Sequence, residues 1–421
     1  MRNGGRALSG TNEAGLLEHA LTERALELRF AECVAFLGAF SQVAQGRVTA
    51  ADPPVWCEAR GWTSYLRGLT AQEVELAEVD AGAWFRHDAR APESLRFFAE
   101  SADTLTRLPR SGAVPSTSFR PTPLVKERKS QQIDALIAAL RPLAEKSERV
   151  VDIGTGKGHL SRLASESWLC AALGLDRNER LLSSATALIR GEPAEYQKLD
   201  ALAEALPLRA SDLVLGLHAC GEVTDIALAS ALGVGARMAF VSCCLQKQRA
   251  PERLASSSFG RSLGFSLSRE VLGLSNLMGR ALGIEVPQSV SIEAHQARHA
   301  LRLLLELRGV STEPGEEMRG VNRRRARKGL DTLAFEACQA RGLLVPSPIE
   351  LEHCKMVGET QFSAMRRWSL PRALLPRVIE CAVAFDRAAL LQERGHVASV
   401  TEAFPAAVSP RNILLVGVPD R

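Results

Sequence analysis

One short segment restricts the fold of this chain more than any other, the run VVDIGTGKGHLS from Val150 to Ser161. It begins with residues typical of a short buried strand, passes through Gly154, Gly156 and Gly158, and continues into a helical pattern. Glycines let the backbone adopt positive φ and approach a ligand closely, and the first N–H groups of a helix are open to that ligand. The segment therefore predicts a strand, a glycine turn and a helix N-terminus that together hold a cofactor.

The acid inside this segment, Asp152, distinguishes between two kinds of cofactor. The pattern D-x-G-x-G-x-G looks like the G-x-G-x-x-G fingerprint of dinucleotide sites. Such a site holds a pyrophosphate at the helix N-terminus, where an acid is unfavourable. S-adenosylmethionine has no phosphate, and its methionine part carries an ammonium and a sulfonium. Asp152 therefore favours S-adenosylmethionine over NAD, with a glycine turn that binds nothing as the structural alternative.

Two further acids follow predicted strands. The run CAALGLDR ends a second strand at Asp176, and an acid about 20 residues beyond such glycines accepts hydrogen bonds from ribose hydroxyls. A third short strand, around Tyr196 to Leu199, ends at Asp200, which could accept a hydrogen bond from the adenine amino group. Both acids have a structural alternative as helix caps, Asp200 for a helix that begins at Ala201.

Composition is typical of a globular protein in a reducing compartment. The 421 residues suit two domains or one elaborated core. No apolar run reaches the roughly 18 residues of a membrane span, and the N-terminus MRNGGRALSG lacks the apolar centre of a secretory signal. Nine cysteines without a C-x-x-C pair argue against a disulfide framework. We therefore expect a cytoplasmic protein, and the net charge of +4 is too small to indicate nucleic-acid binding by itself.

The order of patterns along the chain predicts an α/β fold. Residues 11–110 have apolar positions at helical spacing, and a segment rich in Ser, Thr and Pro from Arg110 to Pro123 is typical of a linker. From Arg149 onward strands alternate with helices, which indicates a parallel sheet. The fourth strand is DLVLGLHAC from Asp212, and the fifth is ARMAFVSCCL from Ala236.

The last third of the chain completes the predicted sheet. A long helix over IEAHQARHALRLLLELRG is followed by several short helices up to about residue 395, and two strand-like runs, HVASVTEAF and RNILLVGV, come last. We therefore predict a Rossmann-like, seven-stranded sheet with a C-terminal antiparallel hairpin. A helical N-terminal region precedes the sheet, and a helical insertion precedes the hairpin.

Four motifs together resemble a known family. VVDIGTGKGHLS, GLHACGEVTD from Gly216, SCCLQK from Ser242 and SPRN from Ser409 are similar to the methyltransferase-like family whose members include a ribosomal-RNA-adenine-dimethylase-domain-containing protein. The catalytic domain of the eukaryotic tRNA 2′-O-methyltransferase acting on the acceptor stem is more distantly similar. KERKSQQI from Lys126 resembles the basic, Gln-containing helix before the first strand in both. The resemblance covers about residues 120–310 and the final hairpin.

This resemblance implies a class I S-adenosylmethionine-dependent methyltransferase. It divides the chain into a helical N-terminal region at residues 1–118 and a methyltransferase domain at 119–421, with the helical insertion at about 313–395. The residues that it assigns to the cofactor are Asp152, Gly154, Thr155, Gly156, Gly158, Asp176, Asp200 and His218. His218 and Cys220 end the fourth strand, where the acceptor enters, because ligands of open α/β sheets bind at the carboxyl ends of the strands. We take these two residues as catalytic candidates, and predict no metal.

Three explanations of His218, Cys220, Cys243 and Cys244 stay open. Thiolates and imidazole suit zinc, although the HAC and CC spacings are poor for one tetrahedral site. Cys220 could be a nucleophile, as in cytosine C5 methylation, which requires a lowered thiol pKa. The cysteines could instead be small packing residues, which we favour for Cys243 and Cys244. His218 could act as a general base or orient the acceptor, with an ordinary pKa of about 6.5, or be structural.

The acceptor is the least constrained part of the prediction. Methylases of exocyclic base amines usually carry Asn/Asp-Pro-Pro-aromatic after the fourth strand, where this chain has HACGEV, and this counts against adenine N6 methylation. The basic run RGVNRRRARKG from Arg319 to Gly329 could contact phosphates or be a solvated loop. Lys126, Arg128 and Lys129 add positive charge before the first strand.

We therefore predict an S-adenosylmethionine-dependent methyltransferase with an unidentified acceptor, for which tRNA or rRNA is a candidate. Two alternatives stay open. One is an inactive methyltransferase fold that serves as an RNA-binding or assembly module. The other is an NAD-dependent oxidoreductase.

Overall fold

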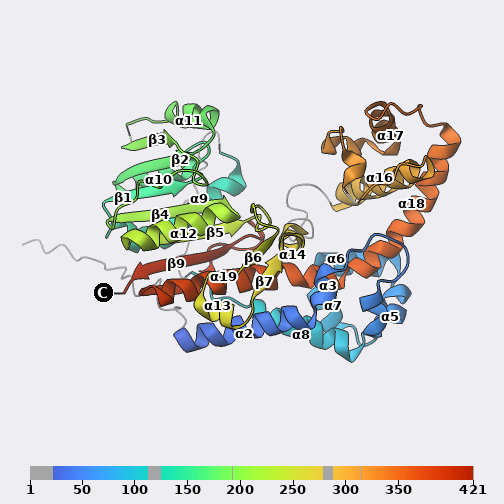
Figure 1. The fold of residues 1–421 in the computed structure, drawn as a ribbon, viewed down its shortest axis with the longest axis horizontal. Coiled ribbons are helices and arrows are strands. Elements are labelled where there is room, and N and C mark those ends of the chain that lie inside the picture. The colour runs from blue at the N-terminus through green and yellow to red at the C-terminus, as the bar shows by residue number, and fades with distance from the viewer. Residues whose placement is uncertain (1–21, 112–124, 192, 278–287, 314, 421) are drawn as a thin grey trace, which may run out of the picture. The chain divides into compact units, whose positions relative to one another are not determined.

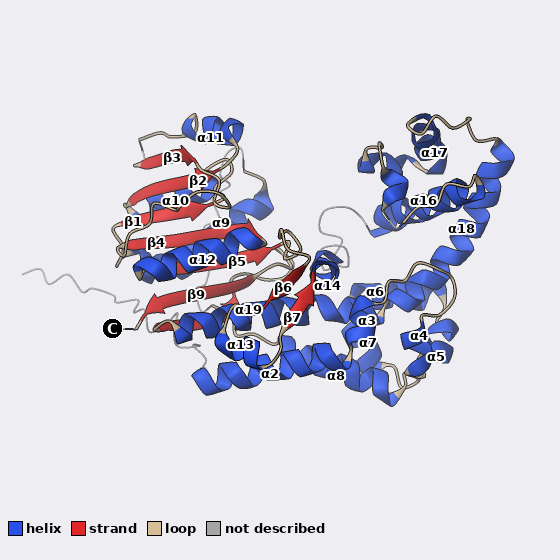
Figure 2. Cartoon of the chain, in the orientation of Figure 1, coloured by secondary structure: helices blue, strands red, loops and turns tan. Residues whose placement is uncertain are grey.

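A computed structural model describes residues 22–111, 125–191, 193–277, 288–313 and 315–420 (Figure 2). The chain divides into two compact units. Unit 1 comprises the described residues up to Gly38, Leu105–Ser275 and those from Arg377 onward, and unit 2 comprises Ala39–Thr104 and Asn276–Pro376. The predicted domain boundary at residue 118 lies outside the described residues and stays a prediction.

Unit 1 contains a seven-stranded sheet with the strand order β3-β2-β1-β4-β5-β9-β8 (Figure 1). Strands β1 to β5 are parallel, and β9 is antiparallel to both β5 and β8. The strands are β1 Arg149–Ile153, β2 Ala171–Asp176, β3 Ala194–Lys198, β4 Asp212–Cys220, β5 Arg237–Cys243, β8 His396–Glu402 and β9 Ile413–Pro419. This topology confirms the predicted α/β, Rossmann-like sheet with its C-terminal antiparallel hairpin.

Helices cover both faces of the sheet, which explains why the central strands are apolar on both sides. Helices α9 (Glu127–Ala144) and α10 (His159–Trp168) pack on one face, where Val150, Leu215 and Val241 share a core with Ile133 and Leu160. On the other face, Phe240 and Leu415 lie beside Val383 of α19 (Leu375–Glu393). Helix α12 (Glu222–Val234) packs on β4 and β5 (Figure 1), and α11 (Glu179–Thr186) packs on β2 and β3.

Smaller elements complete unit 1 beside the sheet. Phe30 of α2 makes ring contacts with Phe259 and Phe265, at centroid distances of 6.1 and 5.1 Å. These aromatic residues join α2 to the segment that connects β6 and β7, the strands of a two-stranded sheet that the sequence patterns did not predict. The elements are α2 Glu23–Ala39, β6 Glu252–Leu254, α13 Ser258–Ser262, β7 Ser266–Ser268, α14 Arg269–Leu272 and η1 Gly273–Leu277.

A largely buried ion network joins α12, β6 with the segment after it, and α19. The Asp225 carboxylate accepts hydrogen bonds from Arg253, at 2.5 and 3.1 Å, and from Arg387, at 2.8 Å. Burial alone would raise the pKa of Asp225, but the charges of Arg387 and Arg253 outweigh it and lower the pKa to about 2. Asp386, fully buried, accepts from Arg253 at 3.4 Å and from the backbone N–H of Ser257 at 3.0 Å. Four buried or half-buried charges therefore neutralise one another in the interior of unit 1.

The described part of unit 2 is helical. Its elements are α3 Ser41–Gln45, α4 Val55–Ala59, α5 Thr63–Gly68, α6 Ala71–Val79, α7 Ala81–His87, α8 Glu93–Thr106, α16 Gln288–Leu307, η2 Glu316–Met318, η3 Arg323–Lys328, α17 Leu330–Gln339, α18 Pro348–Ser369 and η4 Pro371–Leu374. These helices confirm the predicted helical N-terminal region and the helical insertion before the hairpin. None of the helices within the described ranges is both long and apolar enough to cross a membrane.

Two segments far apart in sequence associate within unit 2. Arg366 of α18 forms a two-pronged ion pair with Glu78 of α6, at 2.8 Å for each bond. The indole N–H of Trp368 donates to the carbonyl oxygen of Ala51 at 2.9 Å. The helical insertion therefore packs against the N-terminal helices, a tertiary pairing that local sequence patterns do not show.

Candidate functional site

A cavity of about 520 Å³ opens at the edge of the sheet where the parallel strands end. Its volume lies within the range of small-molecule sites. The cavity is lined by the ends of β1, β2 and β4 and by the loops that follow β3, β4 and β5, through Ile153, Gly154, Leu175, Asp176, Arg177, Leu199, Asp200, Ala201, Leu202, His218, Ala219, Cys220, Glu222, Val223, Lys247, Gln248 and Arg249. This is the edge at which open α/β sheets bind their ligands.

The glycine turn begins directly after β1. Gly154, Gly156 and Gly158 have φ values of 74°, 60° and 68°, a region that other residues adopt only with strain. Helix α10 begins at His159, with Gly158 as its N-cap. The strand, the glycine turn and the helix N-terminus are therefore arranged as the sequence predicts.

Two features of Gly158 favour glycine: its positive φ and the lack of room for a Cβ atom. The Tyr196 hydroxyl donates to the carbonyl oxygen of Gly158 at 3.1 Å, and a Cβ at this position would lie 2.3 Å from the hydroxyl oxygen. Gly235, at the end of α12, has a nearly identical φ of 69° and nothing within 4 Å of its Cβ position. Substituting each glycine by alanine therefore distinguishes the cost of a positive φ, common to both sites, from the cost of steric contact, present only at Gly158.

We expect Gly158→Ala to destabilise the protein more than Gly235→Ala. Both substitutions incur the left-handed penalty of about 1–2 kcal/mol, and only the first adds overpacking of about 1–3 kcal/mol. Urea unfolding of the two variants measures the difference. Equal destabilisation would contradict the close packing of Tyr196 against the turn.

The buried Asp152 side chain is hydrogen-bonded to the glycine turn. The side chain is 2% exposed and accepts a hydrogen bond from the Thr155 hydroxyl at 2.7 Å, and this hydroxyl also lies 2.8 Å from that of Ser161. Burial raises the pKa of Asp152, while Thr155 and the charge of Lys129 oppose this rise. Asp152 is not among the residues that line the cavity. The structure therefore shows it fixing the glycine turn, and its predicted contact with the methionine part of a cofactor stays a prediction.

Asp176 and Asp200 both line the cavity. Asp176 accepts from the N–H of Gly156 at 2.9 Å and from that of Asn178 at 2.8 Å. A carboxylate has about four acceptor positions, so these two bonds leave room for ribose hydroxyls. Asp200 accepts from the N–H of Leu202 at 3.0 Å. The residues after Asp200 form a turn, so the predicted helix starting at Ala201 is wrong.

His218 lies at the end of β4 with an unusual backbone and a lowered pKa. Its φ of 65° is in the left-handed region, and its Nε2 lies 2.9 Å from the Oε1 of buried Gln132. Because an amide oxygen only accepts, Nε2 carries the hydrogen. Burial, then the charges of Lys129 and Arg411, lower the pKa of His218 to about 4. The imidazole is therefore neutral at pH 7, and its pKa is well below the ordinary value of about 6.5.

The loops after β4 and β5 are tied together by backbone contacts. The N–H of Gly221 donates to the carbonyl oxygen of Cys243 at 3.2 Å, and the N–H of Glu222 donates to that of Lys247 at 3.1 Å. A Cβ at Gly221 would lie 1.8 Å from the carbonyl oxygen of Lys247, so only glycine allows this approach. Lys247 and the ion pair between Glu222 and Arg249, at 2.6 Å, line the cavity and were not predicted as site residues. Their only sequence signal is their position inside or beside the GLHACGEVTD and SCCLQK motifs.

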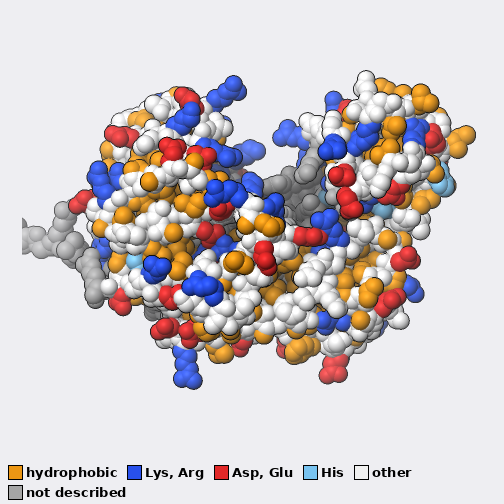
Figure 3. Space-filling view, in the orientation of Figure 1, with side chains coloured by type: hydrophobic (Ala, Val, Ile, Leu, Met, Phe, Trp, Pro, Cys, Tyr) orange, Lys and Arg blue, Asp and Glu red, His pale blue; other side chains and the backbone are white. Residues whose placement is uncertain are grey.

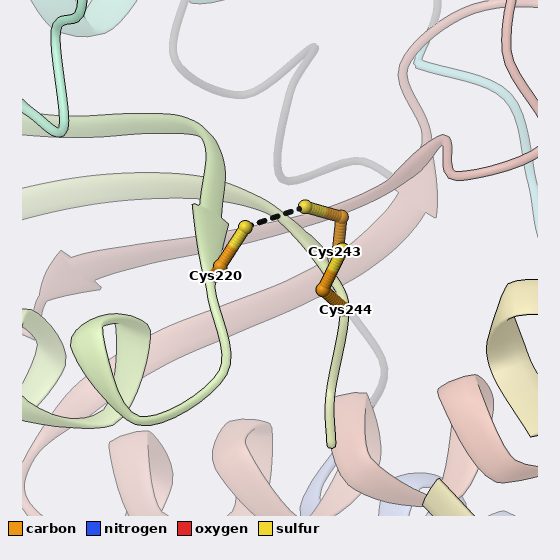
Figure 4. Close-up of side chains that lie close together, drawn as sticks. All are labelled: Cys220, Cys243 and Cys244. Atoms are coloured by element: carbon orange, nitrogen blue, oxygen red, sulfur yellow. Dashed lines mark hydrogen bonds between the residues drawn. The ribbon is translucent and has the colours of Figure 1, made fainter. Parts of the chain in front are cut away.

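The structure brings Cys220, Cys243 and Cys244 together (Figure 4). The Sγ atoms of Cys220 and Cys243 are 3.1 Å apart, and all three Sγ atoms lie within 4.8 Å of one another. Hydrogen bonding from Cys243 lowers the pKa of Cys220, but hydrogen bonding with Cys244 and burial outweigh this and leave the pKa raised. A nucleophilic cysteine requires a lowered thiol pKa, and a nucleophilic role of Cys220 stays a prediction.

Comparison with known proteins gives a family match to part of the chain. Residues 128–251 match the model of a family described as a methyltransferase domain. This match shows a methyltransferase domain in these residues, in agreement with the predicted enzyme class and with S-adenosylmethionine as the cofactor of such a domain. The antiparallel β9 agrees, because dinucleotide-binding sheets of the order 3-2-1-4-5-6 are parallel at the corresponding position. The narrower family that includes the ribosomal-RNA-adenine-dimethylase-domain-containing protein stays a prediction.

Several solved methyltransferases are weakly similar to the chain. The plantazolicin methyltransferase BpumL in complex with SAH is 14% identical, with 43% of this chain and 61% of that chain covered and a TM-score of 0.23. Magnesium protoporphyrin IX methyltransferase from Synechocystis PCC 6803 with bound SAH is 15% identical, with 39% and 79% covered and a TM-score of 0.24. Coclaurine N-methyltransferase bound to N-methylheliamine and SAH is 11% identical, with 82% and 94% covered and a TM-score of 0.24. The chain thus spans about three-fifths of the length of BpumL, and at these TM-scores the likeness carries no argument about its chemistry.

Proposed function

We propose that the whole chain is an active S-adenosylmethionine-dependent methyltransferase and that its acceptor is RNA. The observation that supports the first part is the cavity of about 520 Å³ between the glycine turn, Asp176 and His218. The cofactor's methionine part would lie at the glycine turn, its ribose at Asp176 and its adenine near Asp200. This order follows the carboxyl ends of β1, β2 and β3 and directs the sulfonium towards β4.

The protein's part in the reaction is to position the acceptor. The sulfonium of S-adenosylmethionine is already activated, so holding the acceptor in line with the methyl group supplies much of the rate. A base with a pKa of about 4, as His218 has, removes protons poorly at pH 7. We therefore assign His218 the role of orienting the acceptor through a neutral imidazole, held by Gln132, instead of that of a general base.

Exposed cations support a polyanionic acceptor. Arg177 and Lys247 line the cavity and are exposed, and Figure 3 shows Lys and Arg side chains gathered at the edge of unit 1 where the parallel strands end. Unit 2 contributes a second basic surface, which we call the η3 patch and define as Arg324, Arg327 and Lys328, all exposed. The segment is a 3₁₀ helix and not an irregular loop, with Ala326 between these cations 3% exposed in a hydrophobic core, while the charged side chains themselves are solvated. The cations are therefore presented by a packed 3₁₀ helix.

The acceptor class is tested by incubating the purified chain with methyl-labelled S-adenosylmethionine and with separate tRNA, rRNA and protein fractions. We expect label in an RNA fraction that ribonuclease releases. Label found only in protein or in small molecules would reject RNA and keep the methyltransferase. RNA binding without any transfer would favour the inactive, RNA-binding module.

The η3 patch is expected to contribute to RNA affinity through its cations, each of which can neutralise a phosphate. In the triple variant Arg324→Gln, Arg327→Gln, Lys328→Gln, the salt dependence of RNA binding should weaken by up to about 0.7–0.9 in the log–log slope for each phosphate that is no longer neutralised. A salt series of filter-binding measurements gives this slope. Lys355→Gln is the matched control, because it removes one exposed cation from α18 of the same unit. An unchanged slope in the triple variant would exclude this patch from the RNA interface.

A further inference from the structure

Strand pairing, and not spacing along the sequence, brings Cys220, Cys243 and Cys244 together in one cluster. Cys220 and Cys243 are register partners on the neighbouring strands β4 and β5, and the register shifts between Leu217 and Cys220. This bulge places Cys220 beside Cys243, and Cys244 follows directly along the chain. Bulges commonly re-aim a side chain next to a functional site. The HAC and CC segments, whose spacings are each poor for a tetrahedral site, therefore place three sulfurs close together.

Backbone strain accompanies this arrangement. Among the described residues, three that are not glycine have positive φ, and two of them, His218 at 65° and Cys244 at 46°, lie at the cluster. Such conformations are unfavourable by about 1–3 kcal/mol each and persist where the surrounding structure enforces them. The cysteines do not need this strain to pack as small apolar side chains. The strained backbone lies at the same place as the three sulfurs.

The sulfur geometry suits a thiophilic cation. A tetrahedral zinc site with Zn–S distances of about 2.3 Å has sulfurs about 3.8 Å apart. The observed 3.1 Å between Cys220 and Cys243, and the limit of 4.8 Å for the whole group, bracket that value. Small side-chain rotations therefore suffice to form a three-thiolate site.

Charge also favours such a site. Zinc held by three thiolates has a net charge of −1, because each thiol loses a proton when the ion binds. The Nζ of Lys247 lies 3.8 Å from the Sγ of Cys220, so its positive charge offsets the excess negative charge. In the thiol form, Cys220 and Cys243 both point to the carbonyl oxygen of His218, at 3.3 and 3.5 Å. Two thiols that share one carbonyl acceptor have weaker bonds than thiolates on a metal ion.

We propose that Cys220, Cys243 and Cys244 form a binding site for zinc or a similarly thiophilic divalent cation. No fourth His, Cys, Asp or Glu within the described residues belongs to the group, and Cys220 lines the cavity. Three thiolates would leave one coordination position for water or an acceptor atom, which could approach from the cavity at Cys220. An open position of this kind distinguishes reactive zinc sites from closed structural ones.

The site is tested by titrating metal into the full chain after complete reduction and removal of metal with a chelator. Co²⁺ is the optical probe, because tetrahedral thiolate ligation gives a sulfur-to-cobalt charge-transfer band and strong visible bands. We expect one equivalent of Co²⁺ to bind with both signals, and Zn²⁺ to displace it. Neither the cofactor nor the acceptor is needed, so the outcome is independent of the proposed function.

Serine variants assign the ligands. Replacing a ligating thiolate removes a metal bond, so C220S, C243S and C244S should each weaken Zn²⁺ binding by about 100-fold or more. This loss exceeds the roughly 10–100-fold typical of mutating a residue that only hydrogen-bonds to a metal ligand. C170S is the matched control, since Cys170 is another partly buried cysteine of unit 1 outside the cluster. Thermal melts of all four variants verify folding.

Two results would overturn the metal site. One is a fully reduced protein, with all nine thiols titratable, that shows no charge-transfer band in excess Co²⁺. The other is tight Zn²⁺ binding that survives in all three cluster variants, which would place the ion elsewhere.

Discussion

Asp176→Asn is expected to weaken binding of S-adenosylmethionine about 100-fold. Each hydrogen bond to a charged group contributes about 1.5–3 kcal/mol, and about 1.4 kcal/mol corresponds to tenfold in affinity. The carboxylate lies on the cavity wall with acceptor capacity beyond its bonds to Gly156 and Asn178. Asparagine keeps one acceptor oxygen but presents an amide N–H₂ where the second ribose hydroxyl would donate. Calorimetric titration with S-adenosylmethionine or SAH measures the change in affinity.

Glu179→Gln is the control for Asp176→Asn. Glu179 begins α11 three residues later, and its exposed side chain pairs with Lys198 at 3.0 Å. Removing its charge changes the net charge by the same amount without touching the cavity, so we expect wild-type affinity. Thermal melting of Asp176→Asn shows whether the turn stays folded. A folded Asp176→Asn protein that binds the cofactor as tightly as wild type would contradict the ribose assignment.

Asp225→Ala is expected to destabilise unit 1 by about 3–5 kcal/mol, the range for removing one partner of a buried ion pair. The substitution leaves Arg253 and Arg387 facing each other with only Asp386 to compensate. Both guanidinium groups are less than a tenth exposed, and the Asp225 side chain is 24% exposed, so water can replace the carboxylate only in part. Urea unfolding at neutral pH measures the change in free energy of unfolding.

The control for Asp225→Ala breaks an exposed ion pair on the same helix. Glu222→Ala removes the partner of Arg249, whose side chain is 66% exposed, and surface pairs contribute about 0–1 kcal/mol. Comparable destabilisation by the two substitutions would contradict the account of a buried network.

The effect of Asp225→Ala should also depend on pH. The native pKa of Asp225 is about 2, below the unfolded value of about 3.9. A depressed pKa gives stability that is present above the unfolded pKa and lost as the pH falls through the folded one. The gap between wild type and variant should therefore shrink below about pH 4. A gap that stays constant down to pH 2 would place the effect in packing instead of charge.

The parts of the site that could be predicted from sequence depend on local patterns. The glycine turn follows from three closely spaced glycines between an apolar run and a helical run, and all three have positive φ. Asp176 ends a strand that a short apolar run marks, Asp200 lies two residues after the end of β3, and both line the cavity. The parallel sheet followed from the alternation of strands and helices, and its strand order came from the structure.

The other parts depend on contacts between distant residues. The bulge in β4 that joins Cys220 to Cys243 has no signature in HAC or CC. The contact between His218 and Gln132 spans 86 residues, and it comes with burial that lowers the pKa of the imidazole. The burial of the Asp152 side chain and its hydrogen bond with Thr155 likewise have no signature in the glycine motif.

The most direct test of the central claim is transfer of a labelled methyl group from S-adenosylmethionine into a fractionated cell extract. We predict label in at least one fraction with the wild-type chain and its loss with Asp176→Asn at the same cofactor concentration. The absence of label from every RNA, protein and metabolite fraction, together with binding of NAD but not of S-adenosylmethionine, would contradict the account.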